Sequence, residues 1–274
     1  MPQLIKLRQR IKLIGTIQKI TQAMRLVSMS VHSRLNQQLI FIKNYRSELG
    51  QAINAVNDPN LSQFSHTNAP KLIILIGTQK GLCGSFNQEI MHTFEQQKTA
   101  ITDYELLVIG KKLIDTVQRK YQITHKIPKF APTAISEISN KIFNYITKQK
   151  QFSEVICISN QPKSFFAHIT TYNTIVAEPK HIPNKIKNQS DPYAWEQTEA
   201  SIGELLYANQ LKLNIYCSLF DSLIAEYAAR FRSMDNASRN ASSLLEAAER
   251  QYAKARQTKI TRELIELSAI FQTK

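Results

Sequence analysis

Two stripes of apolar residues, one at each end of the chain, predict two long helices. The first stripe lies within residues 3–56, which contain no proline and are followed by the helix-stop pair Asp58-Pro59. Its members recur at steps of four and three, at Leu13, Ile17, Ile20, Met24, Val27, Val31 and Leu35. This spacing lines up apolar side chains along one edge of a helix, and such an edge needs a partner helix to cover it.

The second stripe lies in residues 199–274, which contain no proline and a single glycine. Arg230 and Gln251 interrupt it. Its members are Phe220, Leu223, Tyr227, Met234, Ala237, Ala241, Leu244, Ala248 and Ala255. About 60 helical residues span roughly 90 Å, which is longer than a small domain is wide. We therefore expect the two terminal helices to pair as a long antiparallel coiled coil.

Between these helices the pattern changes to short apolar runs that alternate with helical segments. The predicted strands are residues 71–76, 105–109 and 154–158, with a further edge strand at 170–177. The predicted helices are residues 86–98, 111–120 and 135–148. Alternation of strand and helix predicts an α/β fold with a mostly parallel sheet. The expected domains are a coiled-coil helix at 1–57, a Rossmann-like α/β domain at 71–190 and a second coiled-coil helix at 196–274.

The net charge of +14 favours an acidic or anionic partner. Residues 1–47 hold nine Lys or Arg and no Asp or Glu. One hypothesis is therefore a basic helical protein that binds nucleic acid, although Phe41 and Tyr45 are the only aromatic residues in that stretch for base stacking. No apolar run reaches the roughly 18–20 residues that span a bilayer. We expect no secretory signal, and a transit peptide fits less well than a helix that continues far beyond such a segment.

The strongest candidate for chemistry is the glycine-containing turn at residues 77–84, which follows the first predicted strand. Its spacing matches neither the P-loop nor the dinucleotide fingerprint, so we expect Gly81 and Gly84 to serve a tight turn. A nucleotide-binding enzyme remains a third hypothesis. Cys83 has no histidine motif to activate it, and with Cys157 and Cys217 it is expected to be a reduced thiol. We expect no cofactor, no metal site and no catalytic site.

Three stretches of the sequence carry a resemblance to a known family. The first is IQKITQAMRLV at residues 17–27, and the second is GLCGSFN at residues 81–87, just after the first predicted strand. The third and most specific lies in the last helix, with EYAAR at 226–230, continuing to residue 241, and RQTKITREL at 256–264. Together these stretches resemble the gamma subunit of the rotary F-type ATP synthase, its central shaft. The chain departs from the family pattern at Gln22, at residues 78–80, at Ala225 and in its tail, which indicates a divergent member.

This resemblance implies a shaft without bond chemistry of its own. The terminal helices would form an antiparallel coiled coil inside a ring of alternating alpha and beta subunits. Ion flow through the membrane sector would turn the shaft and drive ATP synthesis on the ring. The implied partners are the alpha and beta subunits, with the epsilon subunit and the membrane c-ring at the foot, and neither nucleic acid nor a small-molecule substrate. The implied location is peripheral, on the cytoplasmic face of the bacterial inner membrane, with the matrix side of the mitochondrial inner membrane as the alternative.

The resemblance also implies roles for single residues. Lys19 and Met24 match positions near the contact with a beta-subunit loop. The matching positions on the last helix, tied to coupling or to the same contact, are Arg230, Arg256, Gln257, Thr261 and Glu263. Gly81, Cys83 and Gly84 would form a turn in the central domain.

Overall fold

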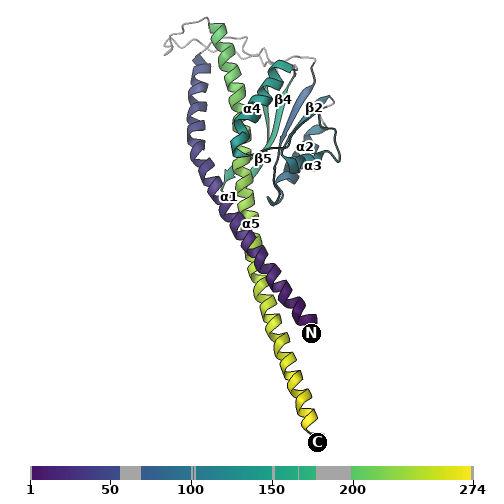
Figure 1. The fold of residues 1–274 in the computed structure, drawn as a ribbon. Coiled ribbons are helices and arrows are strands. Elements are labelled where there is room, and N and C mark those ends of the chain that lie inside the picture. Colours follow the sequence, from purple (N-terminus) through teal and green to yellow (C-terminus); the bar gives the residue numbers. More distant parts are fainter. Residues whose placement is uncertain are drawn as a thin grey trace. The chain divides into compact units, whose positions relative to one another are not determined.

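The structure, a computed structural model, describes residues 2–55, 69–99, 101, 103–149, 152–165, 167–176 and 199–272. Two long helices stand at the ends of the chain, α1 at Pro2–Ala55 and α5 at Glu199–Gln272 (Figure 1). Neither contains a proline after its first turn, so no residue interrupts the backbone hydrogen bonds. The predicted linker at 57–70 and the proline-rich return near residues 179–192 lie almost wholly outside the described residues.

The central sheet has five strands in the order β3-β2-β1-β4-β5. The strands are β1 Lys71–Ile76, β2 Tyr104–Ile109, β3 His125–Ile127, β4 Val155–Ser164 and β5 Ala167–Val176. The β1 strand pairs in parallel with β2 and β4, and β2 pairs in parallel with β3, whereas β5 runs antiparallel to β4. The expected α/β fold with a mostly parallel sheet is confirmed. The sequence did not predict β3, and it ended β4 six residues too early, at residue 158.

The sheet is covered on both faces because its central strands are apolar on both sides. Leu72, Ile74 and Ile76 of β1 enter one core, which they share with α4 (Ile135–Asn144) and the 211–224 stretch of α5. Ile73 and Leu75 enter the opposite core with α2 (Phe86–Lys98) and α3 (Lys111–Val117). A 3-10 turn at Pro132–Ala134 precedes α4, and a π-helix at Tyr145–Gln149 follows it. The sheet domain is therefore an ordinary three-layer α/β body.

The chain divides into two compact units. The first comprises residues 1–29 and 230–274, and the second comprises residues 30–229. The predicted domain boundaries at 57, 71, 190 and 196 stay a prediction, since they follow the ends of elements. Among the described residues, no helix is both long and apolar enough to cross a bilayer.

Candidate functional site

The first unit is an antiparallel pair of helices, formed by the start of α1 and the end of α5. Three contacts show how the two helices are aligned. Ile14 packs with Ala241 and Ala248, Gln18 Nε2 lies 2.8 Å from Ser242 Oγ, and Arg25 Nη1 lies 2.7 Å from Asp235 Oδ1. Residues with increasing numbers on α1 contact residues with decreasing numbers on α5, so the two helices are antiparallel (Figure 1). This pair carries every residue for which the sequence predicted a coupling role.

The inner edge of α1, which faces α5, is not the stripe that the sequence predicted. The inner positions repeat at steps of three and four and include polar residues; they are Ile11, Ile14, Gln18, Thr21, Arg25 and Ser28. Leu13, Ile17, Ile20 and Val27 are instead exposed, by 62%, 45%, 53% and 61%. Each of these four precedes an inner residue by one position, which is a turn of about 100° around the helix axis. The predicted stripe was therefore wrong by one position over residues 13–27 of α1. Its last two members were predicted correctly, because Leu35 is buried in the core of the sheet domain and Val31 packs against that core.

On α5 the predicted seam is correct in part. Met234, Ala241 and Ala248 are buried, but Leu244 is 52% exposed and Leu245 packs in its place. Phe220 and Leu223 belong to the second unit, where they pack in the core of the sheet domain. The apolar stripe of α5 thus serves two different partners along its length.

The helix pair presents apolar side chains to solvent. We call Leu13, Ile17, Ile20, Met24 and Val27 the outer stripe of α1; Met24 is partly buried and the others are exposed. Residues 260–268 of α5 are all exposed, with apolar side chains at Ile260, Leu264, Ile265 and Leu267. Exposed apolar side chains grouped in this way are typical of surfaces that bind another molecule.

The candidate residues occupy two separate zones of the pair. The two polar contacts join residues whose numbers sum to 260 in both cases, 18 with 242 and 25 with 235. By this register Lys19 and Met24 lie beside residues 236–241 of α5. Residues 256–263 lie about 20 positions further along α5, which corresponds to roughly 30 Å at 1.5 Å per residue. The structure therefore does not bring all the predicted coupling residues into one site.

The zone at the end of α5 is open to solvent. Arg256, Gln257 and Thr261 are exposed, and the Thr261 hydroxyl donates to the Gln257 carbonyl oxygen at 3.0 Å. Glu263 is about half exposed and lies 3.3 Å from the Lys259 amine, one turn earlier. An exposed pair of this kind contributes little to stability, so these side chains can exchange partners at low cost.

Arg230 differs from the other candidates because it is only 4% exposed. A guanidinium buried to this extent cannot reach a carboxylate on another subunit without a change in this chain. No local pattern indicates this difference, because an arginine within an interrupted apolar stripe suits either a buried or an exposed position.

The turn at residues 77–84 is held by hydrogen bonds to Asn87, which lies in the first turn of α2. The backbone N–H of Thr78 donates to Asn87 Oδ1 at 3.1 Å, and Asn87 Nδ2 donates back to Thr78 Oγ1 at 2.9 Å. Gly84 has a φ of +63°, which glycine adopts without strain, and Gly81 lies in the same turn. Cys83 is buried, with its Sγ 3.6 Å from the Lys80 carbonyl oxygen. This arrangement fits the predicted structural turn.

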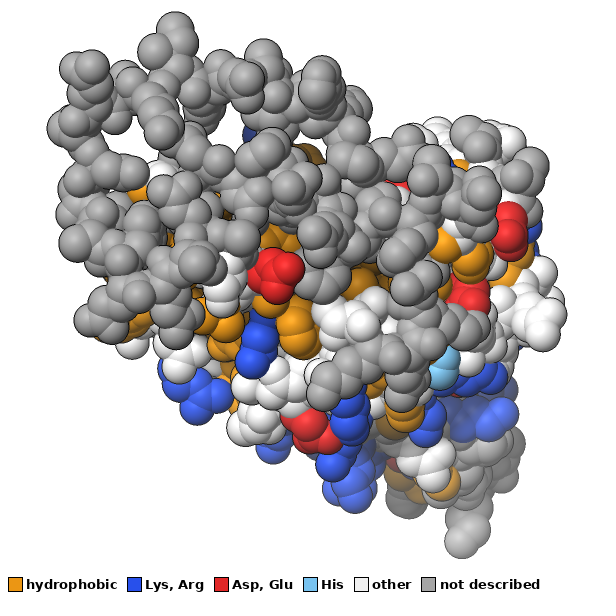
Figure 2. Space-filling model, turned by 90° about the horizontal axis from the view of Figure 1, so that it is seen from above, with side chains coloured by type: hydrophobic (Ala, Val, Ile, Leu, Met, Phe, Trp, Pro, Cys, Tyr) orange, Lys and Arg blue, Asp and Glu red, His pale blue; other side chains and the backbone are white. Residues whose placement is uncertain are grey.

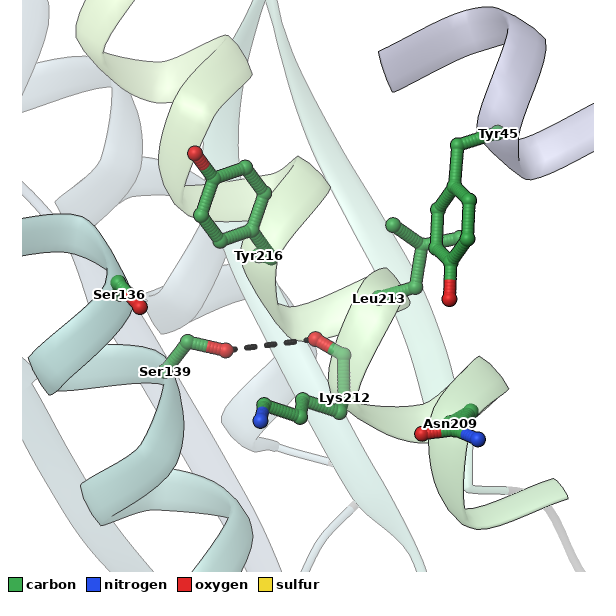
Figure 3. A pocket seen from close by; sticks show the side chains of 7 residues that line it. All are labelled: Tyr45, Ser136, Ser139, Asn209, Lys212, Leu213 and Tyr216. Carbon is green, nitrogen blue, oxygen red and sulfur yellow. Dashed lines mark hydrogen bonds between the residues drawn. The ribbon is translucent and has the colours of Figure 1, made fainter. Parts of the chain in front are cut away.

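A small open cavity in the sheet domain is lined by residues of α4, α5 and the second half of α1 (Figure 3). Its volume is about 220 Å³, and its lining residues are Tyr45, Ser136, Ser139, Asn209, Lys212, Leu213 and Tyr216. Ser139 donates to the Lys212 carbonyl oxygen at 3.3 Å. Pockets that bury a drug-sized ligand are usually about 300–1,000 Å³, so this cavity is too small for a nucleotide. Where the described residues are visible in Figure 2, apolar, basic and acidic side chains all reach the surface.

Comparisons with known proteins agree on one family. A family model described as ATP synthase matches residues 3–271. The ATP synthase gamma chain of Bartonella quintana is 30% identical over 300 residues, and that of Amoebophilus asiaticus is 29% identical over 290 residues. Both alignments cover 98% of this chain and 98% of the relative.

Solved structures agree in fold. The rotor of the Euglena gracilis mitochondrial ATP synthase, in rotational state 1, has a TM-score of 0.72 at 14% identity and covers 94% of this chain and 99% of its own. A second structure of that enzyme, in rotational state 3, has a TM-score of 0.74 at 16% identity and covers 99% of this chain and 94% of its own.

Proposed function

Since the chain belongs to the family of ATP synthase gamma chains, we infer that it is the central shaft of a rotary ATP synthase. It is a non-catalytic subunit, and the catalytic sites lie on the beta subunits. The shaft turns inside the ring, and its asymmetric surface drives the conformational cycle by which ATP is made or hydrolysed. The complex is associated with a membrane.

The observation that best supports this function is the exposed outer stripe of α1. A helix pair that functioned alone would turn its most apolar residues inward, because burial of apolar surface is the main driving force of association. Here Gln18, Thr21 and Arg25 face the partner helix while Ile17 and Ile20 face solvent. The outer stripe fits a bearing formed by other subunits, which would remove these side chains from water.

We propose separate roles for the two zones. Met24, which belongs to the outer stripe, and Lys19, which lies next to that stripe in the sequence, contact a loop of a beta subunit, where the exposed amine of Lys19 pairs with a carboxylate. Arg256, Gln257, Thr261 and Glu263 contact the ring further along the shaft, and the planar guanidinium of Arg256 suits bidentate pairing with a carboxylate. Arg230, being buried, acts within this chain and positions the helix rather than touching a partner.

The partners proposed are the alpha and beta subunits around the helix pair, with the epsilon subunit and the c-ring at the foot. The excess of basic side chains in α1 favours acidic surfaces on those partners. We place the complex on the cytoplasmic face of the bacterial inner membrane. The matrix side of the mitochondrial inner membrane is the alternative.

A co-purification tests this function. The full chain, tagged on the sheet domain, is isolated from gently solubilised membranes, and the associated proteins are identified. We expect alpha and beta subunits together with ATP hydrolysis. Nucleic acid in place of those subunits, retained in a salt-dependent way, would support the basic helical protein instead.

A matched pair of variants sharpens the test. Ile17→Asp places a charge on the outer stripe, and Gln257→Ala removes an exposed side chain from the second zone. We expect the first to reduce the amount of ring subunits recovered and the second to leave assembly intact while lowering coupling. Equal recovery for Ile17→Asp and the unchanged chain would contradict a bearing at this stripe.

A further inference from the structure

The inner edge of the helix pair is polar where it lies beside Met24. Thr21 is 7% exposed and Ser28 is 1% exposed, so both are buried between the helices. Their hydroxyls donate to backbone carbonyls of α1 itself, those of Gln18 and Met24, at 2.9 and 2.7 Å. These two side chains are therefore satisfied without α5, and the directional contacts across the pair come from other residues.

Asp235 makes one polar contact across the helix pair and another within α5. Its Oδ1 accepts a hydrogen bond from Arg25 Nη1 of α1 at 2.7 Å, and its Oδ2 lies 2.7 Å from Arg239 Nη2 on α5. The Asp235 side chain is 15% exposed and that of Arg25 is 38% exposed, whereas that of Arg239 is 78% exposed. The hydrogen bond from Arg25 also holds the pKa of Asp235 below its usual value. Both carboxylate oxygens are thus engaged, one of them across the pair.

The apolar contacts nearby do not specify a register by themselves. The cluster around Ile14 uses Ala241, Leu245 and Ala248 of α5, and its two alanines lie seven residues apart. Small side chains repeated at this interval offer similar surfaces when one helix slides by a whole number of turns. Hydrophobic contact is non-directional, whereas a polar pair held between two helices favours one register.

We propose that Arg25 and Asp235 form a register clamp, a pair of positioning residues that holds the Met24 stretch of α1 at a fixed axial position against α5. The clamp prevents the helices from sliding past each other when the shaft is under torque. Lys19 and Met24 then meet the ring at a defined rotational angle. This inference rests on the proposed function, since the load comes from rotation within the ring.

Cross-linking measures the register directly. The full chain carries Gln18→Cys, Ser238→Cys and Ser242→Cys, and mild oxidation is followed by mass spectrometry of the linked peptides. The native cysteines are buried, which limits competing disulfides. With the clamp intact, the 18–242 link should dominate over the 18–238 link. Asp235→Asn or Arg25→Gln should lower the ratio of the two links about tenfold, the effect of losing a charge-assisted hydrogen bond.

The inverted variant Arg25→Asp/Asp235→Arg/Arg239→Asp keeps the same cluster with every charge reversed. It should restore the ratio of links, because the geometry of the clamp does not depend on which helix carries the carboxylate. The control variant Glu246→Gln/Arg250→Gln removes an exposed pair at 3.3 Å that lies within α5 alone, and it should leave the ratio unchanged. An unchanged ratio in Asp235→Asn and Arg25→Gln would overturn the clamp, as would failure of the inverted variant to restore it.

The functional readout is the ratio of ATP-driven ion pumping to ATP hydrolysis, measured per assembled complex in inverted membrane vesicles. A purely structural pair would change the amount of complex and not this ratio. We expect Asp235→Asn to lower the ratio about twofold or more and the inverted variant to restore it, by the same loss of a directional contact. A normal ratio in every variant would overturn the proposal. If the unchanged chain does not assemble with ring subunits at all, the proposed function fails, and the cross-links in the isolated full chain still decide on the clamp.

Discussion

Ile14 and Ile17 lie about one turn apart on α1. Their replacement by alanine should have different effects on the stability of the isolated chain and on its assembly with other subunits. Ile14 is 8% exposed and packs against α5, so Ile14→Ala should destabilise the isolated chain by about 2 kcal/mol, near the low end for a buried isoleucine because solvent can reach the small cluster. Ile17 and Ile20 are 45% and 53% exposed. Their replacement by alanine should change the stability of the isolated chain by less than about 0.5 kcal/mol each.

The effects on assembly with the ring subunits should be in the reverse order, larger for Ile17 and Ile20 than for Ile14. Each replacement removes three carbons, worth about 0.8 kcal/mol apiece when they move from water into apolar contact. Only the exposed part of Ile17 and Ile20 is left for a partner to bury, so each substitution should weaken assembly by roughly 1 kcal/mol. Together they should weaken assembly by about 2 kcal/mol, which is roughly a thirtyfold change in affinity.

The assay has two arms. Urea unfolding of the isolated full chain, followed by circular dichroism, gives the free energy of unfolding of Ile14→Ala and of the double variant Ile17→Ala/Ile20→Ala. Titration of each chain into purified alpha and beta subunits, with recovered ATP hydrolysis as the signal, gives the affinity of assembly. The reasoning fails if the double variant destabilises the isolated chain as much as Ile14→Ala does, or if it assembles with unchanged affinity.

Three further predictions concern single residues. Gly110 has a φ of +96°, and a Cβ there would lie 2.6 Å from the Gly77 carbonyl oxygen and 2.7 Å from that of Thr78. Gly110→Ala should therefore lower the free energy of unfolding, measured with urea, by about 2 kcal/mol or more. Burial raises the pKa of the Cys157 thiol to about 12, so a thiol reagent at pH 8 should leave it unmodified in the native chain and label it after unfolding. The hydrogen bond from Arg25 lowers the pKa of Asp235. The difference in free energy of unfolding between the native chain and Asp235→Asn should therefore be constant at neutral pH and should disappear only as the pH falls below about 4. A difference that disappears between pH 8 and 6 would refute this.

The sequence predicted most of the fold because its apolar runs are clear. The first strand was placed correctly at Lys71–Ile76, and α2 was placed correctly at Phe86–Lys98. The short strand β3, His125–Ile127, was missed because its first two residues are exposed and no apolar run marks it. The end of β4 was missed because residues 159–164 are polar, and only pairing with β5 keeps them in the sheet.

The candidate site was less predictable for a different reason. A stripe of apolar residues shows that a helix has a partner, but it does not show whether the partner lies in the same chain. Ile17 and Ile20 were therefore assigned to the inner edge of α1, where the structure has Gln18 and Thr21. The contact of Arg25 with Asp235, 210 positions away in the sequence, depends on the register of the pair, which no local pattern specifies.

The inversion of polar and apolar positions suits a part that must turn inside another. Apolar contact is non-directional, so the outer stripe can pass from one ring subunit to the next without breaking a specific set of hydrogen bonds at each step. Directional contacts such as Arg25 with Asp235 hold a defined geometry, and here they lie between the helices of the shaft itself. If the polar contacts lay on the outer surface and the apolar contacts lay between the helices, the shaft would bind the ring tightly and its two helices would slide past each other. If the proposed function holds, the placement of Ile17 outward and Arg25 inward would let the shaft rotate freely against the ring while it stays rigid within itself.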